Sequence, residues 1–226
     1  MNEKPKTNNV VIFGTEELSS LIWYCLLHDS QFHPVAFTVD AAYLRKPVHE
    51  GLPVVAFEEL PQRHPPGSVC LILPLGFRAI NGLRRQRYEQ AMAMGYDFAS
   101  YVSGRASTWP DLRMGKNCLI YELAVIQPFS RLGDDVIIRS SAHVSHHCKI
   151  GNHVFIAAGA VFGGNVTVGD QAFVGIGAVV RDGVTIAERS FIGAGAVVVA
   201  DTEPGAAYIG NPAKKISHSA MELTGG

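Results

Sequence analysis

The sequence predicts a small N-terminal α/β domain with a Rossmann-like parallel sheet, followed by a left-handed parallel β-helix of hexapeptide repeats. Two observations predict the β-helix. From Met114 onward every sixth residue is bulky and apolar for fifteen consecutive steps, and the residue four places after each is small or β-branched. One large and one small inward position in every six residues is typical of hexapeptide repeats. We take the left-handed winding of the β-helix from this repeat class. A third observation predicts the α/β domain, because short apolar runs alternate with helical patterns over the first hundred residues.

The α/β domain comes first in the chain. Apolar runs that predict strands cover residues 9–14, 34–40, 54–60 and 69–74, and helical patterns cover residues 18–28 and 78–94. Strands that alternate with helices predict a parallel sheet, and such sheets bind ligands at the carboxyl ends of their strands. We therefore expect a binding site near Gly14, Asp40 and Gly76. A break in the pattern then divides the chain into residues 1–105 and 106–226, the latter holding the β-helix and a C-terminal tail.

Each six-residue repeat is expected to form one short strand and one corner, so that three repeats close a triangular coil and fifteen make five coils. The coils stack at the strand spacing of about 4.8 Å and bury an aliphatic column. The bulky positions are Met114, Ile120, Ile126, Leu132, Ile138, Val144, Ile150, Ile156, Phe162, Val168, Val174, Val180, Ile186, Ile192 and Val198. The small positions are Cys118, Ala124, Ser130, Val136, Ala142, Cys148, Val154, Ala160, Val166, Ala172, Ala178, Val184, Ser190, Ala196 and Thr202. Glycine often follows the bulky residue, as at Gly151 and Gly163, which favours unusual backbone angles there.

Composition narrows the class of protein. The chain has 226 residues, a hydrophobic content of 47% and a net charge of −1. This charge gives no reason to expect binding to nucleic acid or to a membrane surface, and no apolar run is long enough to span a bilayer. The start of the sequence is polar and lacks the apolar region of a secretory signal, so we expect a cytoplasmic protein. The four cysteines show no CxxC spacing and are expected to be reduced thiols.

Four segments of the β-helix carry a specific resemblance, namely VSHHCKIG at 144–151, AGAVFGGNVTVGD at 158–170, VGIGAVVRDGVTI at 174–186 and YIGNPAKKI at 208–216. Together with the α/β domain, they make nearly the whole chain resemble the bacterial hexapeptide-repeat sugar O/N-acyltransferases, which modify nucleotide-linked amino sugars or sialic acid. The resemblance implies a homotrimer. It also implies that the α/β domain holds the nucleotide of the sugar and that the β-helix holds acetyl-CoA, the co-substrate, between neighbouring subunits.

The catalytic candidates lie in a cluster of histidines. His143, His146, His147 and His153 fall within eleven residues. Relatives carry a histidine at the position of His146, followed by an acidic residue, and imidazole titrates near the pH at which it must take a proton from an attacking amine. The resemblance therefore implies that His146 is the general base. Because His147 occupies the place of the acid, we include it as a second catalytic candidate.

The resemblance also implies contacts to both substrates. The positions expected to bind the nucleotide sugar are Gly14, Thr15, Asp40, Gly76, Asn81 and Arg84. The positions expected to bind the coenzyme are Phe155, Gly164, Ile176, Ala194 and Lys214. The amide of Gly164 is a candidate for stabilising the oxyanion, and Lys214 is a candidate for meeting the phosphates of the coenzyme. Two features differ from the relatives, because their glycine-rich turn after the first strand is GTEELS here and several of them have a histidine in place of Phe155.

These observations predict an acyl-CoA-dependent N-acyltransferase with acetyl as the expected acyl group. The amine of a nucleotide-linked amino sugar would attack the thioester directly, in surface polysaccharide biosynthesis such as that of the lipopolysaccharide O-antigen. Two alternatives are an O-acetyltransferase of a sialic-acid-like sugar and a noncatalytic nucleotide-sugar-binding protein. A third is a zinc site of histidines, as in hexapeptide-prism carbonic anhydrases, although we expect no metal. The nucleotide (UDP, dTDP or GDP), the amine position and the acyl chain stay open.

Overall fold

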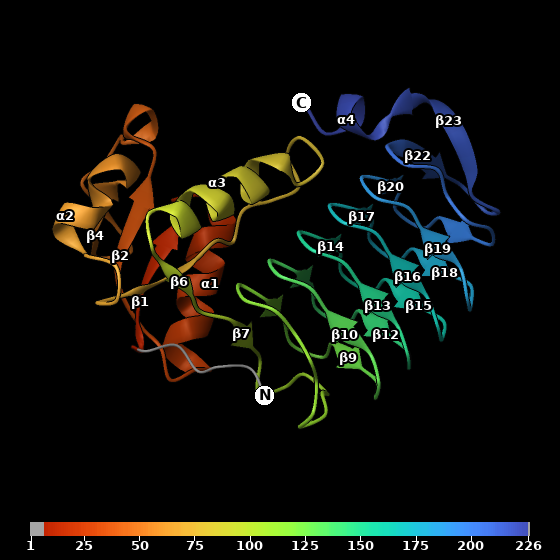
Figure 1. The fold of residues 1–226 in the computed structure, drawn as a ribbon, viewed down its shortest axis with the longest axis horizontal. Coiled ribbons are helices and arrows are strands. Elements are labelled where there is room, and N and C mark those ends of the chain that lie inside the picture. The colour runs from red at the N-terminus through yellow and green to blue at the C-terminus, as the bar shows by residue number, and fades with distance from the viewer. Residues whose placement is uncertain (1–6, 226) are drawn as a thin grey trace.

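The computed structural model describes residues 7–225 and contains an α/β domain beside a triangular prism of stacked coils (Figure 1). The strands of the α/β domain are β1 (Asn9–Phe13), β2 (His33–Val39), β3 (Val48–His49), β4 (Leu52–Ala56), β5 (Cys70–Ile72) and β6 (Asp97–Phe98). Its helices are α1 (Glu17–His28), α2 (Leu60–Arg63) and α3 (Gly82–Ala93), with 3₁₀ helices at Ala41–Tyr43 and Phe57–Glu59. The sheet order is β3-β4-β2-β1-β5-β6, and every pair except β3 with β4 is parallel.

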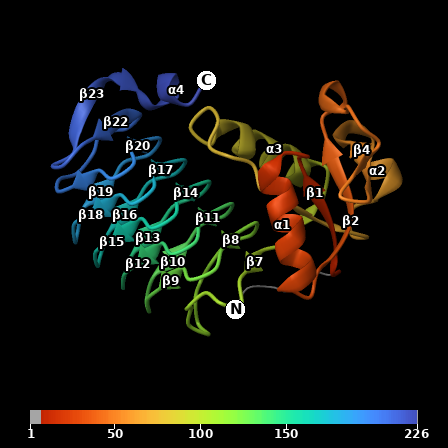
Figure 2. The same cartoon turned by 180° about the vertical axis from the view of Figure 1, so that it is seen from behind.

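Both faces of this sheet are covered, which explains why β1 is an unbroken apolar run. Val10 and Ile12 point to the face that α1 covers, and the α1 residues Ile22 and Leu26 belong to the same buried cluster. Val11 belongs to the cluster on the opposite face, which α2 and α3 cover. Helix α1 lies between the sheet and the first coils of the prism (Figure 2). The parallel α/β unit that the sequence predicts is therefore confirmed.

The prism contains fifteen short strands and a C-terminal extension. The strands are β7 (Tyr101–Val102), β8 (Leu119–Ile120), β9 (Val125–Ile126), β10 (Arg131–Leu132), β11 (Ile137–Ile138), β12 (His143–Val144), β13 (Lys149–Ile150), β14 (Phe155–Ile156), β15 (Val161–Phe162), β16 (Thr167–Val168), β17 (Phe173–Val174), β18 (Val179–Val180), β19 (Thr185–Ile186), β20 (Phe191–Ile192) and β21 (Val197–Val198). The extension contains β22 (Ala206–Ile209), β23 (Lys214–Ser219) and α4 (Ala220–Leu223).

Three sheets form the sides of the prism. We call the sheet β7-β8-β11-β14-β17-β20-β22-β23 the docking face, the sheet β9-β12-β15-β18-β21 the second face and the sheet β10-β13-β16-β19 the third face. Successive strands within a face are parallel, with Ile137 opposite Phe155 and His143 opposite Val161, except that β22 and β23 are antiparallel. Because the chain visits the three faces in turn, each coil has three corners. The corner between the second and third faces lies opposite the docking face.

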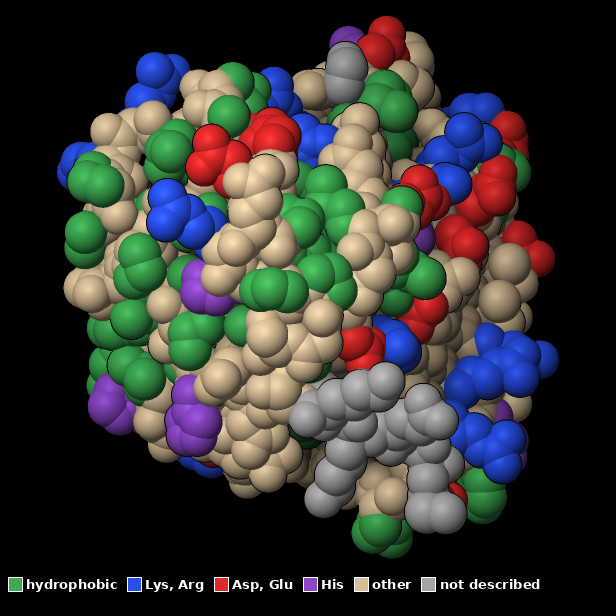
Figure 3. Space-filling view, turned by 60° about the vertical axis from the view of Figure 1, so that its left-hand side comes forward, with side chains coloured by type: hydrophobic (Ala, Val, Ile, Leu, Met, Phe, Trp, Pro, Cys, Tyr) green, Lys and Arg blue, Asp and Glu red, His purple; other side chains and the backbone are tan. Residues whose placement is uncertain are grey.

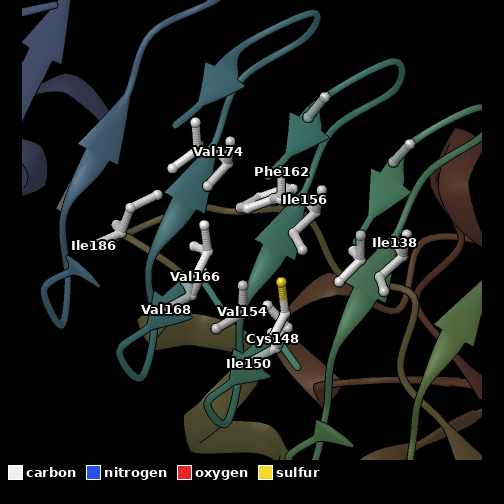
Figure 4. Close-up of a cluster of buried hydrophobic side chains, with 14 of the residues drawn as sticks. Ile138, Cys148, Ile150, Val154, Ile156, Phe162, Val166, Val168, Val174 and Ile186 are labelled. Carbon is white, nitrogen blue, oxygen red and sulfur yellow. The ribbon is translucent and has the colours of Figure 1, made fainter. Parts of the chain in front are cut away.

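The interior of the prism is the column of inward side chains that the six-residue period predicts. The bulky positions from Ile120 to Val198 are all buried, and Met114 packs against the end of the column. Figure 4 shows bulky and small residues of several coils, among them Ile150, Val154 and Phe162, pointing into the same interior. The hydroxyl-bearing members of the small set are also satisfied, since the Oγ of Ser130 donates to a backbone carbonyl and accepts a backbone amide. The predicted β-helix is confirmed.

The role of the glycines that follow bulky positions differs from the prediction. Gly151 and Gly163 do not have positive φ angles, whereas corner residues such as Leu123, His147 and Gly159 do. At Gly163 a Cβ atom would lie 2.6 Å from the amide nitrogen of Asp182 in the next coil. The glycines are therefore required by the close stacking of coils and not by unusual backbone angles.

Aromatic side chains fix the α/β domain on the docking face. Phe155 and Phe173 project outward from successive coils, and both contact Phe77 of the loop before α3, with ring centroids 5.7 and 4.1 Å from it. Phe173 also stacks on Phe191 of the following coil at 4.9 Å. Phe155 is only 6% exposed. We expected Phe155 to contact the coenzyme, but the structure gives it a packing role between the two domains.

A buried ion pair ties the same interface together. Arg84 of α3 has no exposed surface, and its Nε donates to Oδ2 of Asp135, a corner residue of the prism, at 2.9 Å. Asp135 also accepts hydrogen bonds from Asn117 and from Nδ1 of His153. Asn81, equally buried, donates to the backbone oxygens of residues 171 and 172. Arg84 and Asn81 were expected to bind substrate, and this expectation is wrong because both are enclosed within the domain interface.

The change from one domain to the other occurs before residue 105. The sheet of the α/β domain ends with β6 at Phe98, and β7 at Tyr101 already pairs with the prism strand β8. Asp29, at the end of α1, accepts hydrogen bonds from the hydroxyls of Tyr101 and Ser103. These bonds lower the pKa of the Asp29 carboxyl, with the bond from Ser103 as the largest cause.

The surface carries charges of both signs. Figure 3 shows acidic and basic side chains intermixed over the face that it draws, in keeping with the net charge of −1. Within residues 7–225 no helix is long and apolar enough to cross a membrane.

The buried pair of Arg84 and Asp135 generates a prediction about stability. Asp135→Asn leaves the guanidinium of Arg84 buried without a counter-charge, and we expect it to lower the free energy of unfolding by about 3–5 kcal/mol. Urea denaturation followed by circular dichroism measures the change. Glu188→Gln is the matched control, because it breaks a solvent-exposed pair with Arg189 that is expected to contribute about 1 kcal/mol or less. Equal losses of unfolding free energy in the two variants would contradict a stabilising role for the buried pair of Arg84 and Asp135.

Candidate active site

A cleft of about 800 Å³ opens at the carboxyl ends of β1 and β2 and beside the loop that follows β5. Gly14, Thr15 and Asp40 line it, as expected for a ligand site of a parallel sheet. Gly76 does not line the cleft, although its neighbour Leu75 does. The structure thus brings three of the six expected substrate residues together in one cavity.

Gly14 has a specific structural reason for being glycine. Its φ angle is +97°, and a Cβ atom there would lie 2.6 Å from the hydroxyl oxygen of Ser19. The Ser19 hydroxyl donates to the carbonyl oxygen of Phe13, so it closes the turn from β1 to α1. Only a residue without a side chain fits this turn, which leaves the backbone at the cleft open to a ligand.

Three arginines give the cleft a positive lining. Arg45, Arg78 and Arg87 contribute to its walls, along with the acidic Glu16 and Asp40. Arg87 is bound to Asp40, with Nη2 at 2.7 Å and Nε at 3.2 Å from Oδ2. Among the residues that the structure describes, Arg45 and Arg78 form no salt bridge. Their guanidinium groups are therefore available to an anionic ligand.

The sequence prediction missed Arg45 and Arg78, whereas Arg87 lies in a charged run of α3 that could neutralise phosphates. Leu83, Gln86 and Arg87 all line the cleft and lie on one face of α3, at positions i, i+3 and i+4. This spacing could have assigned Arg87 to the face of α3 that lines the cleft. Arg84 lies on another face of the same helix and is buried against the prism. Arg45 lies outside the helices and strands of the sheet, where no periodicity could have identified it.

The loop between β5 and α3 has an unusual backbone. Ala79, Ile80 and Asn81 all have positive φ angles, of 52°, 46° and 64°, a conformation that is particularly unfavourable for a β-branched residue. Contacts from elsewhere hold it, because the hydroxyl oxygen of Thr224 accepts from the amide of Ile80, and Arg84 donates to the side-chain oxygen of Asn81. Arg78 and Ala79 reach the cleft from this loop, so the prism and the C-terminal segment help to shape it.

The two catalytic candidates lie on the prism, at the corner between the second and third faces. His146 and His147 form the turn from β12 to β13, and both are exposed. Their Nδ1 atoms are 3.2 Å apart, within hydrogen-bonding distance. The backbone amide of His146 donates to Oε1 of Gln127 in the preceding coil. We call these two residues the histidine pair.

Gly164 lies directly under the ring of His146. A Cβ atom at this position would lie 2.8 Å from Nε2 and 3.0 Å from Nδ1 of that imidazole. The amide of Gly164 donates to Oδ1 of Asp182, at 2.7 Å. Its expected role as an oxyanion donor does not fit this geometry, because the amide already has an acceptor. Gly164 instead provides the space in which the His146 ring lies.

The other expected coenzyme positions lie apart from the histidine pair. Ile176 and Ala194 occupy corners between the docking and second faces, and Ile176 is 65% exposed. Lys214 is exposed at the start of β23. Within one chain, the structure therefore does not gather these residues around His146.

The remaining histidines and the thiols have other environments. His143 projects from the second face, and His153 is held at the domain interface by Asp135. Desolvation raises the pKa of the Cys148 thiol, and it raises the pKa of Cys118 to about 12. A thiolate nucleophile is therefore unfavourable at either position. In the described part of the chain, no group of three or more His, Cys, Asp or Glu side chains is arranged to hold a metal ion.

The histidine pair and the cleft lie on different sides of the molecule. The α/β domain contacts the docking face, whereas the histidine pair lies at the opposite corner of the triangular prism. In a single chain, the corner between β12 and β13 lies across the prism from the α/β domain (Figure 1), and side chains fill the core of the prism (Figure 4). A reaction that uses both features needs the cleft of one chain and the histidine pair of another.

Comparisons with known proteins agree with this architecture. The family model for the bacterial transferase hexapeptide (six repeats) matches residues 129–164 and 165–200. No curated protein sequence matches the chain at a significant level. Among solved structures, PerB from Caulobacter crescentus, in complex with CoA and GDP-perosamine, is 29% identical, with a TM-score of 0.84 over 92% of this chain and 97% of that chain.

A second solved structure is the acetyltransferase domain of PglB from Neisseria gonorrhoeae FA1090. It is 26% identical, with a TM-score of 0.84 over 93% of this chain and 100% of that chain, and it has also been solved in complex with acetyl coenzyme A. WeeI from Acinetobacter baumannii AYE, 22% identical with a TM-score of 0.67 over 92% of this chain and 99% of that chain, shares the fold. Residues 129–200 match the bacterial transferase hexapeptide, and nearly the whole chain is similar in structure to PerB and to the acetyltransferase domain of PglB; these similarities identify the chain as an acyltransferase.

Proposed function

We propose that this chain is an acetyl-CoA-dependent N-acetyltransferase that acts on the amine of a nucleotide-linked amino sugar. The observation that carries the proposal is the nearly full-length structural match to PerB, which was solved with CoA and GDP-perosamine. The match covers 92% of this chain, so it spans both the α/β domain and the prism. GDP-perosamine is accordingly the first acceptor to test.

The cleft of the α/β domain binds the nucleotide in this proposal. Arg45 and Arg78 lie free on its wall, where two guanidinium groups can neutralise a diphosphate. The backbone at Gly14 and Thr15 approaches the same ligand from the carboxyl end of β1. Asp40, at the end of β2, is held in place by Arg87 and can accept a hydrogen bond from a sugar or base.

His146 is the general base in this proposal. Its Nε2 takes a proton from the sugar amine as the amine nitrogen attacks the thioester carbon of acetyl-CoA. The new C–N bond forms, the C–S bond breaks, and the proton passes from Nε2 to the departing sulfur to give CoA-SH. Two variants of the Caulobacter perosamine N-acetyltransferase, in which one histidine is replaced by Asn or Ala, have been solved in complex with CoA and GDP-perosamine. The raised thiol pKa values favour direct attack over an acyl-cysteine intermediate.

The site is completed by neighbouring chains in a homotrimer. Val161 and Val179 project outward in successive coils of the second face, and each is 41% exposed. Ile176, at the adjoining corner, is more exposed still. A flat apolar side of this kind fits a second copy of the chain, which would place the histidine pair of one subunit near the cleft of another. Ile176, Ala194 and Lys214 are the proposed coenzyme contacts along this interface.

We further propose that the enzyme works in the cytoplasm and supplies an acetylated sugar for a surface polysaccharide such as O-antigen. The resemblance to sugar acyltransferases supports this assignment.

Replacement of the general base is the first test of the mechanism. His146→Gln keeps a polar side chain but cannot accept and then release a proton, so we expect kcat to fall by a factor of about 10² or more. Thiol release from acetyl-CoA with GDP-perosamine measures the rate. His33→Gln, at an exposed position of β2, is the matched control and is expected to retain the wild-type rate. A rate unchanged by His146→Gln would show that another group takes the proton.

Reversal of charge in the cleft tests nucleotide binding. Arg78→Glu places a carboxylate beside the proposed diphosphate, and we expect the KM for GDP-perosamine to rise roughly tenfold or more, with the KM for acetyl-CoA unchanged. Steady-state kinetics with each substrate varied in turn measures both constants. Arg63→Glu makes the same charge change on α2, away from the cleft residues, and serves as control. An equal effect of both variants would show that only net charge matters.

A further inference from the structure

We infer that His147 is the positioning residue of His146: its Nδ1 accepts a hydrogen bond from Nδ1–H of His146 and thereby keeps Nε2 of His146 free of a proton. This inference rests on the proposed function, since it explains how the proposed base is held in its reactive form. A carboxylate performs this orienting task in Ser-His-Asp triads, whereas here a neutral imidazole performs it.

The geometry of the pair permits only one proton between the two rings. The Nδ1 atoms are 3.2 Å apart, so one of them donates and the other accepts. If His146 donates, its neutral ring carries the proton on Nδ1 and the lone pair on Nε2. Among residues 7–225 neither Nε2 atom has a hydrogen-bond partner, so both are open to substrate or water. This tautomer is the one that a general base at Nε2 requires.

Both rings are restrained by neighbouring coils. His147 has a φ angle of +58°, and its ring lies against that of Phe129 in the preceding coil, with centroids 4.7 Å apart. The ring of His146 lies over Gly164 in the following coil, where no Cβ atom obstructs it. The two imidazoles meet nearly at right angles, at 83°. Phe129 and Gly164 thus hold the histidine pair from either side.

The hydrogen bond between His146 and His147 matters most when His146 is protonated, because of the charges around the histidine pair. Lys149 on β13 and the imidazole of His143 on β12 flank the turn, and Asp182 lies two coils further along the same corner. Oδ1 of Asp182 already accepts the amide of Gly164. A cationic His146 therefore depends on the acceptor nitrogen of His147, because a hydrogen bond from a charged donor is stronger than one from a neutral donor.

Nitrogen NMR of the full chain labelled with ¹⁵N-histidine tests the inference directly. Two variants separate hydrogen bonding from shape: His147→Asn keeps an acceptor oxygen and tolerates a positive φ angle, whereas His147→Phe keeps the stacked ring but has no acceptor. We expect His146 to carry its proton on Nδ1 in the wild type and in His147→Asn. In His147→Phe we expect the proton to move to Nε2, the tautomer that free imidazole side chains favour. Spectra of His146→Gln assign the signals.

Two NMR results would overturn the inference. One is a proton on Nε2 of His146 in the wild type, and the other is an unchanged tautomer in His147→Phe. Thermal unfolding of each variant confirms that the comparison is made on folded protein. Because this readout needs no substrate, it decides the inference even if GDP-perosamine proves not to be the acceptor, a result that would count against the proposed function alone.

Kinetics with acetyl-CoA and GDP-perosamine provide a second readout. We expect His147→Phe to lower kcat roughly 10- to 100-fold with little change in either KM, and His147→Asn to stay within about threefold of the wild type. His33→Phe, an equal change at an exposed site, is expected to have no effect. Equal losses in the Asn and Phe variants would show that His147 acts through its own titration and not as an acceptor.

Discussion

The attachment of the α/β domain to one face of the prism is the interaction on which the rest of the structure depends. Phe77 packs against Phe155 and Phe173. The buried ion pair of Arg84 and Asp135 fixes the orientation of the two domains at this apolar contact. An unpaired charge in this position would be costly, so the interface has one favourable arrangement. It fixes the strained loop that shapes the cleft, and it leaves the opposite corner of the prism open.

The sequence was most informative where one physical constraint repeats. The buried column of the prism requires a large and a small residue in every six-residue repeat, and positions such as Ile150 and Val154 follow from that period alone. The outward positions carry no such signal, because the three faces have the same period and only contact with another domain distinguishes them. Phe155 was therefore assigned to the coenzyme when it belongs to the interface. Arg84 of α3 was assigned to the substrate, because the sequence does not show that this helix packs against Asp135 of the prism. Gly14 and Asp40 line the same cleft, as the sequence predicts for neighbouring strand ends of a parallel sheet, which converge by topology.

The separation of the cleft from the histidine pair has a consequence for mechanism. The core of the prism is filled, so a substrate bound in the cleft cannot reach the histidine pair of the same chain. Each proposed reaction centre therefore takes the cleft from one chain and the histidine pair from another. The apolar second face supplies the surface on which a second chain can pack, with Val161 and Val179 at its middle. If the cleft and the histidine pair serve one reaction, as proposed, the reaction centre forms between two chains of an oligomer.

Complementation between two impaired variants tests this account most directly. His146→Gln lacks the base but keeps the cleft, and Arg78→Glu impairs the cleft but keeps the base. If each centre combines the cleft of one chain with the histidine pair of another, an equimolar, co-refolded mixture contains intact centres at a frequency of about one quarter, and thiol release at low GDP-perosamine should recover to about that fraction of the wild-type rate. Activity that stays at the level of the separate variants would contradict the account.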